Sequence, residues 1–463
     1  MNKKVFLLSP NSEDSLDPSL ISYSLALGFL ASYAEKAGWT PVVHDCYCYD
    51  WDYTKKRILD VLNKEKPSVV GINSITMNRI AAYKSIDLIK KFDPNIIVIM
   101  GGVQPTIYPE HFLVHHNADI VVRNEGELTF EELLNKFSTN KSYNNVLGIA
   151  YKGKDGKVVI NPPREQIKNL NEMPFMKHEV FLNPDSTHAY FFTSRGCPNN
   201  CNFCSSSVHW GRRWRPRTPK NVVDEIEHVI KSFPKINEIR FMDDTFTLDN
   251  NRVIEICKEL IRRNIKVRWR CSGRVSPISA EMIRWMEKSG CIMISFGVES
   301  GSVRLLKEMG KNQTIEQIFN AFKIVYENST MTPEMFIILG FPNESLGTVN
   351  ETISLIRRVI GVSKKPLILT TARILEIYPG TRLYDLAKSR GLIGDSYWLT
   401  NPETPKFLEK SPKWLKHQKN RILWANWTHA GITPVIKLFF QKQMWRPRKI
   451  YNLLHPYLTG LNY

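Results

Sequence analysis

Short apolar runs alternate with amphipathic segments along the first 150 residues of the chain. Runs rich in Val, Ile and Leu, such as residues 4–10 and 68–74, are separated by segments with apolar positions every three or four residues, such as residues 55–66. The runs predict buried strands and the segments predict helices. Because alternating strands and helices form doubly wound parallel sheets, we expect residues 1–150 to fold as a Rossmann-like α/β domain. Ligands of such sheets bind at the carboxyl ends of the strands, which are followed here by the loops 9–17, 73–79, 101–108 and 124–127.

The same alternation returns in residues 186–400. Six predicted strands alternate with predicted helices there, at residues 189–196, 238–244, 266–275, 292–300, 334–342 and 369–380. Six β/α units predict a partial (β/α)6 barrel, and barrel enzymes carry their sites at the carboxyl ends of the strands. The proline-punctuated residues 151–185 predict a linker before this barrel, and residues 401–463 predict a basic, aromatic helical region after it.

The composition is that of a globular protein, but the charge is uneven. The chain has 463 residues, is 43% hydrophobic and carries a formal net charge of +18, so it is long enough for two or three domains. No acidic residue follows Glu409, whereas ten Lys or Arg do, so this end supplies more than half of the excess charge. A charge concentrated at one end argues less for nucleic acid as a partner. The N-terminal apolar run is too short for a signal peptide, and no run of 18 apolar residues is present. We therefore expect a cytoplasmic protein with reduced thiols.

Three cysteines fall within eight positions, directly after the first predicted strand of the barrel. Cys197, Cys201 and Cys204 have the spacing C-x-x-x-C-x-x-C. Three thiols are an odd number for disulfides and one short of a structural zinc site, although His209 lies five residues further on and could complete one. Three thiolates can instead hold three irons of a 4Fe–4S cluster and leave the fourth iron open. A loop at the top of a barrel favours the cluster over the zinc site.

Several motifs resemble those of a known family. Residues 186–390 resemble a radical SAM domain, on the evidence of the cysteine motif and of the segments FMDDTFTLDN, SFGVESGS, ILGFPNES and YPGTRLYDLA. Residues 1–140 resemble the cobalamin-binding domain that precedes this barrel in one large subgroup, on the evidence of GGVQPTIYPE and NEGELTFEELL. The resemblance implies an enzyme that splits S-adenosylmethionine (SAM) at the cluster to form a 5′-deoxyadenosyl radical. With cobalamin it implies methylation of an unactivated carbon. Radical rearrangement, cyclisation or oxidation, and a non-catalytic redox or RNA-binding iron–sulfur module, are the alternatives.

The resemblance also implies roles for individual residues at successive strand ends. Cys197, Cys201 and Cys204 ligate the cluster, and Asp243 or Asp244 accepts a hydrogen bond from the SAM ammonium group. The remaining expected contacts to the ribose, carboxylate and adenine of SAM come from Ser272, Arg274, Glu299, Gly340 and Tyr378. Other cysteines, such as Cys257, Cys271 and Cys291, lack the cluster spacing and are expected to be buried structural thiols.

The predicted cobalamin domain departs from a common pattern. Many such domains ligate cobalt from below through D-x-H-x-x-G, but none of the eleven histidines has Asp two positions before it. Either cobalamin binds without a histidine ligand, or the domain is empty. We expect the former, with the corrin ring between the loop 73–77 and the loop 101–106. The candidate contacts are Asn73, Ser74, Thr76, Gly101, Gly102, Gln104, Pro105 and Glu125.

The expected partners follow from this chemistry. The substrate is a small molecule, a lipid or a peptide, and an external electron donor such as flavodoxin or ferredoxin reduces the cluster. No nucleic acid is expected. Residues 410–463 contain four tryptophans and ten basic residues, which fits a helical cap on the barrel and also a peripheral contact with an anionic membrane surface.

Overall fold

The computed structural model describes residues 2–12, 23–363, 369–400 and 411–430. The chain divides into two compact units. Unit 1 comprises Met1–Asp244 and Ile377–Pro405, and unit 2 comprises Thr245–Glu376 and Lys406–Tyr463. The predicted domain limits at residues 150, 185 and 400 stay predictions. The end of the predicted loop 9–17 and most of the predicted region 401–463 lie outside the described residues.

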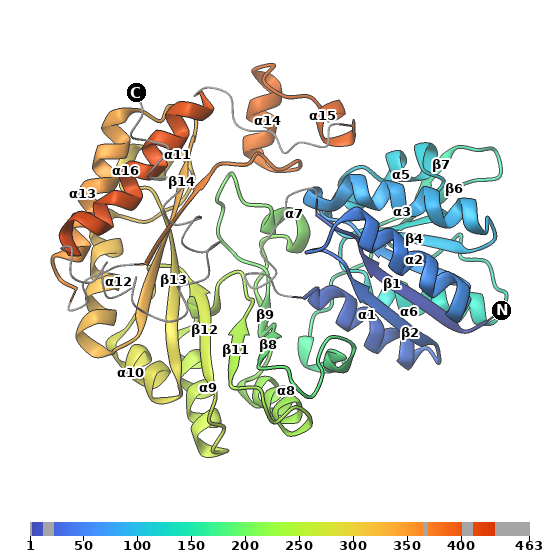
Figure 1. Cartoon of the computed structure of the whole chain (residues 1–463), viewed down its shortest axis with the longest axis horizontal. Helices are drawn as coiled ribbons and strands as arrows, with labels where there is room; N and C mark the ends of the chain where they lie inside the picture. The colour runs from blue at the N-terminus through green and yellow to red at the C-terminus, as the bar shows by residue number, and fades with distance from the viewer. Residues whose placement is uncertain (1, 13–22, 364–368, 401–410, 431–463) are drawn as a thin grey trace. The chain divides into compact units, whose positions relative to one another are not determined.

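Unit 1 begins with a sheet of seven described strands in the order β2-β1-β3-β4-β5-β6-β7 (Figure 1). Its first five strands in this order are parallel, as the sequence predicts. They are β1 (Lys4–Ser9), β2 (Thr40–Asp45), β3 (Val69–Asn73), β4 (Ile97–Gly101) and β5 (Ile120–Val122). The antiparallel strands β6 (Ile149–Lys152) and β7 (Val158–Ile160) complete the sheet.

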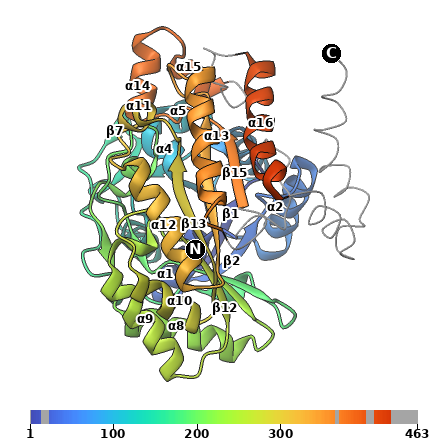
Figure 2. The same cartoon turned by 90° about the vertical axis from the view of Figure 1, so that its left-hand side faces the viewer.

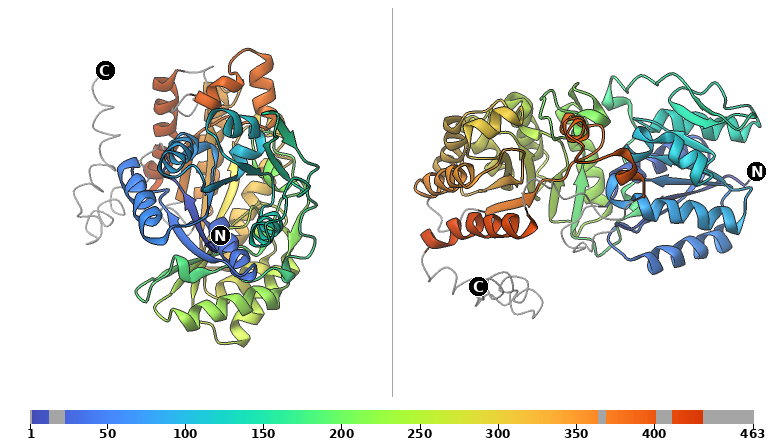
Figure 3. Two further views of the ribbon diagram at one scale, coloured as in Figure 1. Left: turned by 90° about the vertical axis from the view of Figure 1, so that its right-hand side faces the viewer. Right: turned by 90° about the horizontal axis from the view of Figure 1, so that it is seen from above.

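Helices cover both faces of this sheet, which explains why its strands are continuous apolar runs (Figure 3). Phe6 and Leu8 of β1 pack into one core with helices α2 (Trp51–Glu65), α3 (Arg79–Phe92) and α5 (Pro109–His115). Val5 and Leu7 point the other way and pack with helices α1 (Leu25–Lys36) and α6 (Glu127–Ser138). Successive strand residues face opposite sides of the sheet, so both sets must be apolar.

Two of the predicted ligand-binding loops contain short helices. A 3₁₀ turn, η2 (Thr76–Asn78), follows β3, and helix α4 (Val103–Ile107) starts two residues after β4 ends. Residues of the two predicted cobalamin loops therefore have the backbone conformation of a helical turn. This conformation decides where their side chains point.

The remainder of unit 1 carries the cysteine loop. The predicted strand 189–196 is divided into β8 (His188–Phe191) and β9 (Ser194–Arg195). Strand β8 pairs in parallel with β11 (Glu238–Phe241), whereas β9 pairs antiparallel with β10 (Arg215–Pro216). The other described elements of this part are η3 (Leu170–Glu172), η4 (His178–Val180), α7 (Ser206–Trp210), α8 (Pro219–Ser232), α14 (Arg382–Ser389) and α15 (Asp395–Thr400).

Unit 2 continues the alternation of strands and helices. Its parallel strands are β12 (Arg268–Gly273), β13 (Cys291–Glu299), β14 (Thr332–Leu339) and β15 (Leu369–Ile374), in this spatial order. Its helices are η5 (Phe246–Leu248), α9 (Asn250–Arg262), α10 (Ala280–Lys288), α11 (Val303–Glu308), α12 (Ile315–Asn328) and α13 (Leu346–Ile360). All six strands predicted for residues 186–400 are therefore present, and Cys257, Cys271 and Cys291 are buried as expected.

Part of the predicted C-terminal region is helical. Helix α16 (Pro412–Ala430) packs along α13 and against β15 (Figure 2), with Leu415 and Ile422 fully buried. Arg421 donates a 2.7 Å hydrogen bond to Asn350 of α13. Among the described helices, none is both long enough and apolar enough to cross a lipid bilayer.

Candidate functional site

The cysteine loop starts from a tightly constrained backbone position. Gly196 precedes Cys197 with a φ of +83°, and a Cβ there would lie 2.2 Å from the carbonyl oxygen of Arg213. Only glycine fits such a position. The carboxylate of Asp243 holds the preceding segment, because it accepts hydrogen bonds of 2.7 and 2.6 Å from the backbone and hydroxyl of Thr193 and a further one from the Ser194 hydroxyl. The loop therefore leaves β9 in a defined direction.

The three thiols of this loop are half-buried and form no disulfide. Asn199 donates a 3.1 Å hydrogen bond to the sulfur of Cys197. Burial raises the pKa of the Cys204 thiol to about 11, so a metal that binds it has to displace the proton. In the described chain, no three His, Cys, Asp or Glu side chains converge as ligands of a single metal ion. A 4Fe–4S cluster does not need this, since each thiolate binds a different iron, and the donor set fits such a cluster.

The two neighbouring aspartates differ in their surroundings. Asp243 is 4% exposed and is occupied by the hydrogen bonds from Thr193 and Ser194. Asp244 is an exposed residue at the end of the same strand. Protein atoms nevertheless crowd its carboxyl group, and this loss of water, together with the charge of Asp243, raises the pKa of Asp244. Of the two predicted SAM contacts, Asp244 is the accessible one.

Three of the other predicted SAM residues lie at neighbouring strand ends in unit 2. Ser272 is in β12, Glu299 ends β13, and Arg274 follows β12 by one residue. Lys311 connects two of them: its ammonium group lies 2.7 Å from the buried Glu299 carboxylate, and its carbonyl oxygen accepts a 2.5 Å hydrogen bond from Arg274. Sequence reasoning did not identify Lys311, which lies far from any motif and carries no spacing signal.

The last two predicted SAM residues are in different surroundings. Gly340 follows β14 with a φ of +91°, and a Cβ there would lie 3.1 Å from Leu415 of α16. Tyr378 belongs to unit 1, where its ring stacks on Trp398 with 6.4 Å between centroids. The predicted SAM contacts are thus divided between the two units, and their joint role stays a prediction.

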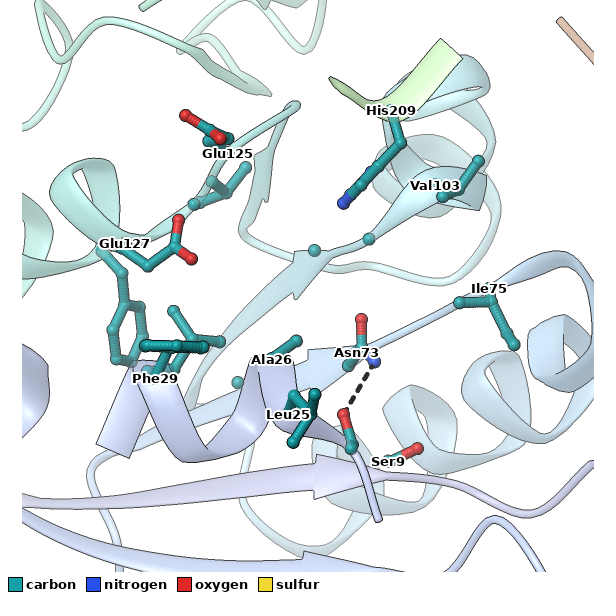
Figure 4. Close-up of a pocket in the computed structure, with 18 of the residues that line it drawn as sticks. Ser9, Leu25, Ala26, Phe29, Asn73, Ile75, Val103, Glu125, Glu127 and His209 are labelled. Carbon is teal, nitrogen blue, oxygen red and sulfur yellow. Dashed lines mark hydrogen bonds between the residues drawn. The ribbon is translucent and has the colours of Figure 1, made fainter. Parts of the chain in front are cut away.

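A cavity of about 450 Å³ opens at the carboxyl ends of the parallel strands of unit 1. Ser9, Asn73 and Gly101 lie on its wall at the ends of β1, β3 and β4 (Figure 4). Apolar residues such as Leu25 and Phe29 of α1 form much of the rest. Its position agrees with the rule for doubly wound sheets, and its volume lies within the usual range for cofactor sites, roughly 300–1,000 Å³.

Half of the predicted cobalamin contacts reach this cavity. Asn73, Gly101, Gly102 and Glu125 line it. The other four do not, because they are buried within the protein: Ser74, Thr76, Gln104 and Pro105. The start of α4 turns Gln104 inward, where its side-chain amide donates a 3.0 Å hydrogen bond to the carbonyl oxygen of Trp398.

Gly101 and Gly102 have different functions in the wall. A Cβ on Gly101 would meet no atom within 4 Å, so this position faces open space. Gly102 has a φ of +104°, and a Cβ there would lie 2.4 Å from the carbonyl oxygen of Ser74. Gly102 is therefore required for the close approach of two loops, whereas Gly101 leaves open space in which a ligand can lie.

Buried charges form one side of the cavity. Glu125 lies 2.5 Å from Arg215 and 3.4 Å from Arg195, and Arg195 lies 2.6 Å from Glu127. Burial by itself would raise the pKa of Glu125, but the hydrogen bond from Arg215 and the charge of Arg195 outweigh it and hold the pKa below its usual range. Glu125 is thus occupied by ion pairs. One carboxylate oxygen of Glu127, Oε2, is buried without a hydrogen-bond partner.

The cavity also contains a histidine that was considered in the sequence only as a zinc ligand. His209, in α7, extends its ring into the cavity (Figure 4). Its Nδ1 atom is buried without a hydrogen-bond partner, and burial lowers the pKa of the ring to about 4, so it is neutral at pH 7. The tertiary structure alone reveals this residue, because α7 is brought to the strand ends by the path of the chain after the cysteine loop.

These features fit a large cofactor with apolar faces and a polar rim, as cobalamin has. The bare surface at Gly101 accepts a flat ring. The ring of His209 extends into the cavity (Figure 4), and the nitrogen at its outer end can bond with the amide groups or the metal of such a cofactor.

Comparisons with known proteins support this assignment. Residues 191–356 match the radical SAM superfamily, and residues 18–134 match the B12 binding domain. The chain is 33% identical over 407 residues to "Uncharacterized methyltransferase PH0819" of Pyrococcus horikoshii, which covers 85% of both chains. It is 30% identical over 343 residues to the anaerobic magnesium-protoporphyrin IX monomethyl ester cyclase of Rubrivivax gelatinosus, which covers 72% of this chain and 61% of the relative.

A solved structure shows the same fold. The cobalamin-dependent S-adenosylmethionine radical enzyme OxsB, with aqua-cobalamin and SAM bound, matches with a TM-score of 0.73 at 20% identity, over 99% of this chain and 70% of OxsB. The predicted fold class and the predicted cofactors, a 4Fe–4S cluster, SAM and cobalamin, are confirmed at the level of the family. The chain belongs to the radical SAM superfamily, in the group whose members carry an N-terminal B12 binding domain.

Proposed function

We propose that this protein is a cobalamin-dependent methyltransferase that uses SAM to methylate an unactivated carbon of a small-molecule substrate. One observation carries the proposal: the cavity at the strand ends is also lined by residues that flank the cysteine loop. Arg195 stands two positions before Cys197, and His209 and Trp210 follow Cys204 by five and six positions. Cobalamin and the cluster therefore have adjacent places within one unit, as transfer of a methyl group from SAM requires.

The residues of the chain hold and orient the cofactors. Bound, the cluster supplies the electron that splits SAM, and cobalamin carries the methyl group. Cys197, Cys201 and Cys204 hold the cluster, and the hydrogen bonds of Asp243 position their loop. Asp244 accepts a hydrogen bond from the SAM ammonium group. The contacts proposed to complete the SAM site are Ser272, Arg274, Glu299, Gly340 and Tyr378.

The cobalamin site is assigned to the wall of the cavity. Asn73, Gly101 and Gly102 face one side of the ring, and the apolar side chains of α1 exclude water. Glu127, on the same wall, contributes its ion pair with Arg195 to the polar rim. Glu125 acts indirectly, since its ion pairs with Arg195 and Arg215 hold the start of the cysteine loop against this wall.

The relative named as a cyclase supports a second candidate, a radical ring closure or rearrangement without methyl transfer. Analysis of the products of SAM distinguishes the two. The full chain is purified without oxygen, its cluster and cobalamin are restored, and a reductant is added. Methyl transfer yields S-adenosylhomocysteine as well as 5′-deoxyadenosine, whereas the alternative yields 5′-deoxyadenosine alone. Absence of S-adenosylhomocysteine from a cobalamin-loaded protein would contradict the proposed methyltransferase.

The partners are proposed on chemical grounds. A low-potential donor such as flavodoxin or ferredoxin reduces the cluster, and a lipid or a peptide is an alternative to a small-molecule substrate. None of the eight cysteines forms a disulfide, which supports a reducing compartment such as the cytoplasm. A peripheral membrane contact through the basic C-terminal residues stays a prediction, because most of them lie outside the described residues.

A further inference from the structure

His209 is the one imidazole among the described residues that line the cobalamin cavity. It is carried by α7, directly after the cysteine loop, whereas the missing D-x-H-x-x-G histidine would have come from the loop after β1. Figure 4 shows the ring extending into the cavity, with Asn73 on the wall that faces it. A ring of the corrin type that rests on the strand ends therefore has His209 on its other face.

The ring of His209 lacks a partner that a buried imidazole normally has. Its Nδ1 atom is buried and accepts or donates no hydrogen bond in the described chain. Its ring contact is the neighbouring Trp210, with centroids 4.1 Å apart and planes at 76°. The other ring nitrogen, Nε2, is at the end of the ring that extends into the cavity (Figure 4), where it can bind a group that arrives with the cofactor.

The segment that carries this ring is held by contacts of Trp210. The Trp210 carbonyl oxygen accepts a 2.7 Å hydrogen bond from the side chain of Gln166. The guanidinium of Arg195 lies 4.9 Å from the centre of the Trp210 ring and is itself held by Glu125 and Glu127. A side chain fixed in this way is suited to metal coordination, which requires accurate placement of the donor atom.

Among the described residues, the facing wall offers no second imidazole. Asn73 presents a carboxamide whose nitrogen donates a 3.4 Å hydrogen bond to the Ser24 hydroxyl, and Ile75 beside it is apolar. Neutral imidazole nitrogen is a common ligand of cobalt and similar metals, whereas an amide nitrogen has no available lone pair.

We propose that His209 is an axial ligand of the cobalt, bound from the side of the cysteine loop. This inference rests on the proposed function, since it requires cobalamin in the cavity. It modifies the expectation that cobalt has no histidine ligand, because it assigns a ligand to the face opposite to the one considered from the sequence. A methyl group needs the same position, so the coordination belongs to the resting cobalt(II) state.

Paramagnetic resonance of the cobalt(II) form tests this directly. The full chain is produced with ordinary histidine and with ¹⁵N-histidine, and both are loaded with cobalamin. We expect three-line nitrogen splitting in the ordinary protein and two-line splitting in the labelled protein. This comparison matters because the benzimidazole of cobalamin is also a nitrogen donor, and its splitting does not change when only the protein is labelled.

Variants identify the histidine. His209→Phe keeps an aromatic ring beside Trp210 and should lose the histidine splitting. His228→Phe, at an exposed position on α8, is the matched control and should keep it. If the Phe variant binds no cobalamin, His209→Ala supplied with free imidazole is used in its place. Nitrogen splitting that returns with imidazole supports the assignment, and absence of this splitting contradicts the assignment.

The other outcomes are equally decisive. Cobalamin bound without a label-dependent change, or with splitting that persists in His209→Phe, overturns the inference and leaves the proposed function intact. A wild-type chain that binds no cobalamin at all overturns both together.

Discussion

Replacing Gly101 with leucine should displace cobalamin and leave the fold intact. A Cβ at this position meets no atom within 4 Å, and its backbone conformation is open to any L residue. The substitution therefore adds no clash in the protein alone, and removing a flexible glycine changes stability by no more than about 1 kcal/mol in the favourable direction. The new side chain occupies the space of the ligand. Overpacking of this kind typically costs about 1–3 kcal/mol, which corresponds to roughly 5- to 150-fold weaker binding.

The assay combines two measurements on the same protein. Cobalamin absorbance after gel filtration over a range of cobalamin concentrations gives the dissociation constant, and thermal unfolding without cobalamin gives the stability. Gly347→Leu is the matched control, because this glycine is exposed on α13 and has Ser345 as its one neighbour, at 3.5 Å. The iron–sulfur spectrum should be unchanged in both variants.

Gly102 is unsuitable for this test, although the sequence makes it equivalent to Gly101. Its φ of +104° and the 2.4 Å approach to the Ser74 carbonyl mean that any side chain disturbs the loop itself. Loss of cobalamin from a Gly102 variant would report unfolding of the loop. A Gly101→Leu protein that binds cobalamin with the wild-type constant would show that the cavity is not the cobalamin site.

Three further predictions concern the cluster, SAM and acid stability. Changing all three loop cysteines to alanine should abolish iron binding and SAM cleavage in a protein that remains folded by circular dichroism; a near-stoichiometric cluster in this variant would refute the assignment. Asp244→Asn should weaken SAM binding by roughly 10- to 150-fold and retain the cluster, because a lost charge-assisted hydrogen bond is worth about 1.5–3 kcal/mol. Asp243→Asn should instead loosen the cysteine loop and lower the iron content. An unchanged dissociation constant for SAM in Asp244→Asn would move the ammonium contact elsewhere. Burial alone would raise the pKa of Glu225, but Arg217 and His178 hold it at about 2, so its ion pairs stabilise the fold above pH 4.5 and this stability is lost as the pH falls towards 2. In Glu225→Gln, the free energy of unfolding should therefore depend less on pH between pH 4.5 and 2, and it should be lower at pH 7 by about 3–5 kcal/mol. A pH dependence equal to that of the wild type would contradict this prediction.

The sequence by itself determined the order and type of the elements and which cysteines are the candidate cluster ligands. Strands such as β1 and β3 are buried on both faces, so their apolar runs are continuous and easily distinguished from the helices between them. The spacing of Cys197, Cys201 and Cys204 is local, because one loop carries all three ligands. Features that depend on neighbours within a few positions are visible in a single sequence.

Local context did not predict the direction of individual side chains. Asp243 and Asp244 are adjacent and chemically identical, yet one is occupied by Thr193 and Ser194, fifty positions away, and the other is exposed. The same is true of Gly101 and Gly102, which differ only in what lies opposite them. Alternation along an extended chain sends successive residues to opposite sides, and the sequence does not show which side faces the ligand.

Only the tertiary structure decided which residues line the cobalamin cavity. Glu125 reads as a cofactor contact in the sequence, but Arg195 and Arg215, 70 and 90 positions further on, neutralise it. Gln104 is turned inward by the first turn of α4, and His209 is brought to the strand ends by α7. Each of these outcomes depends on contacts between segments far apart in the chain. A buried charge or amide is stable only when it has a partner. Folding brings these partners together from distant parts of the sequence.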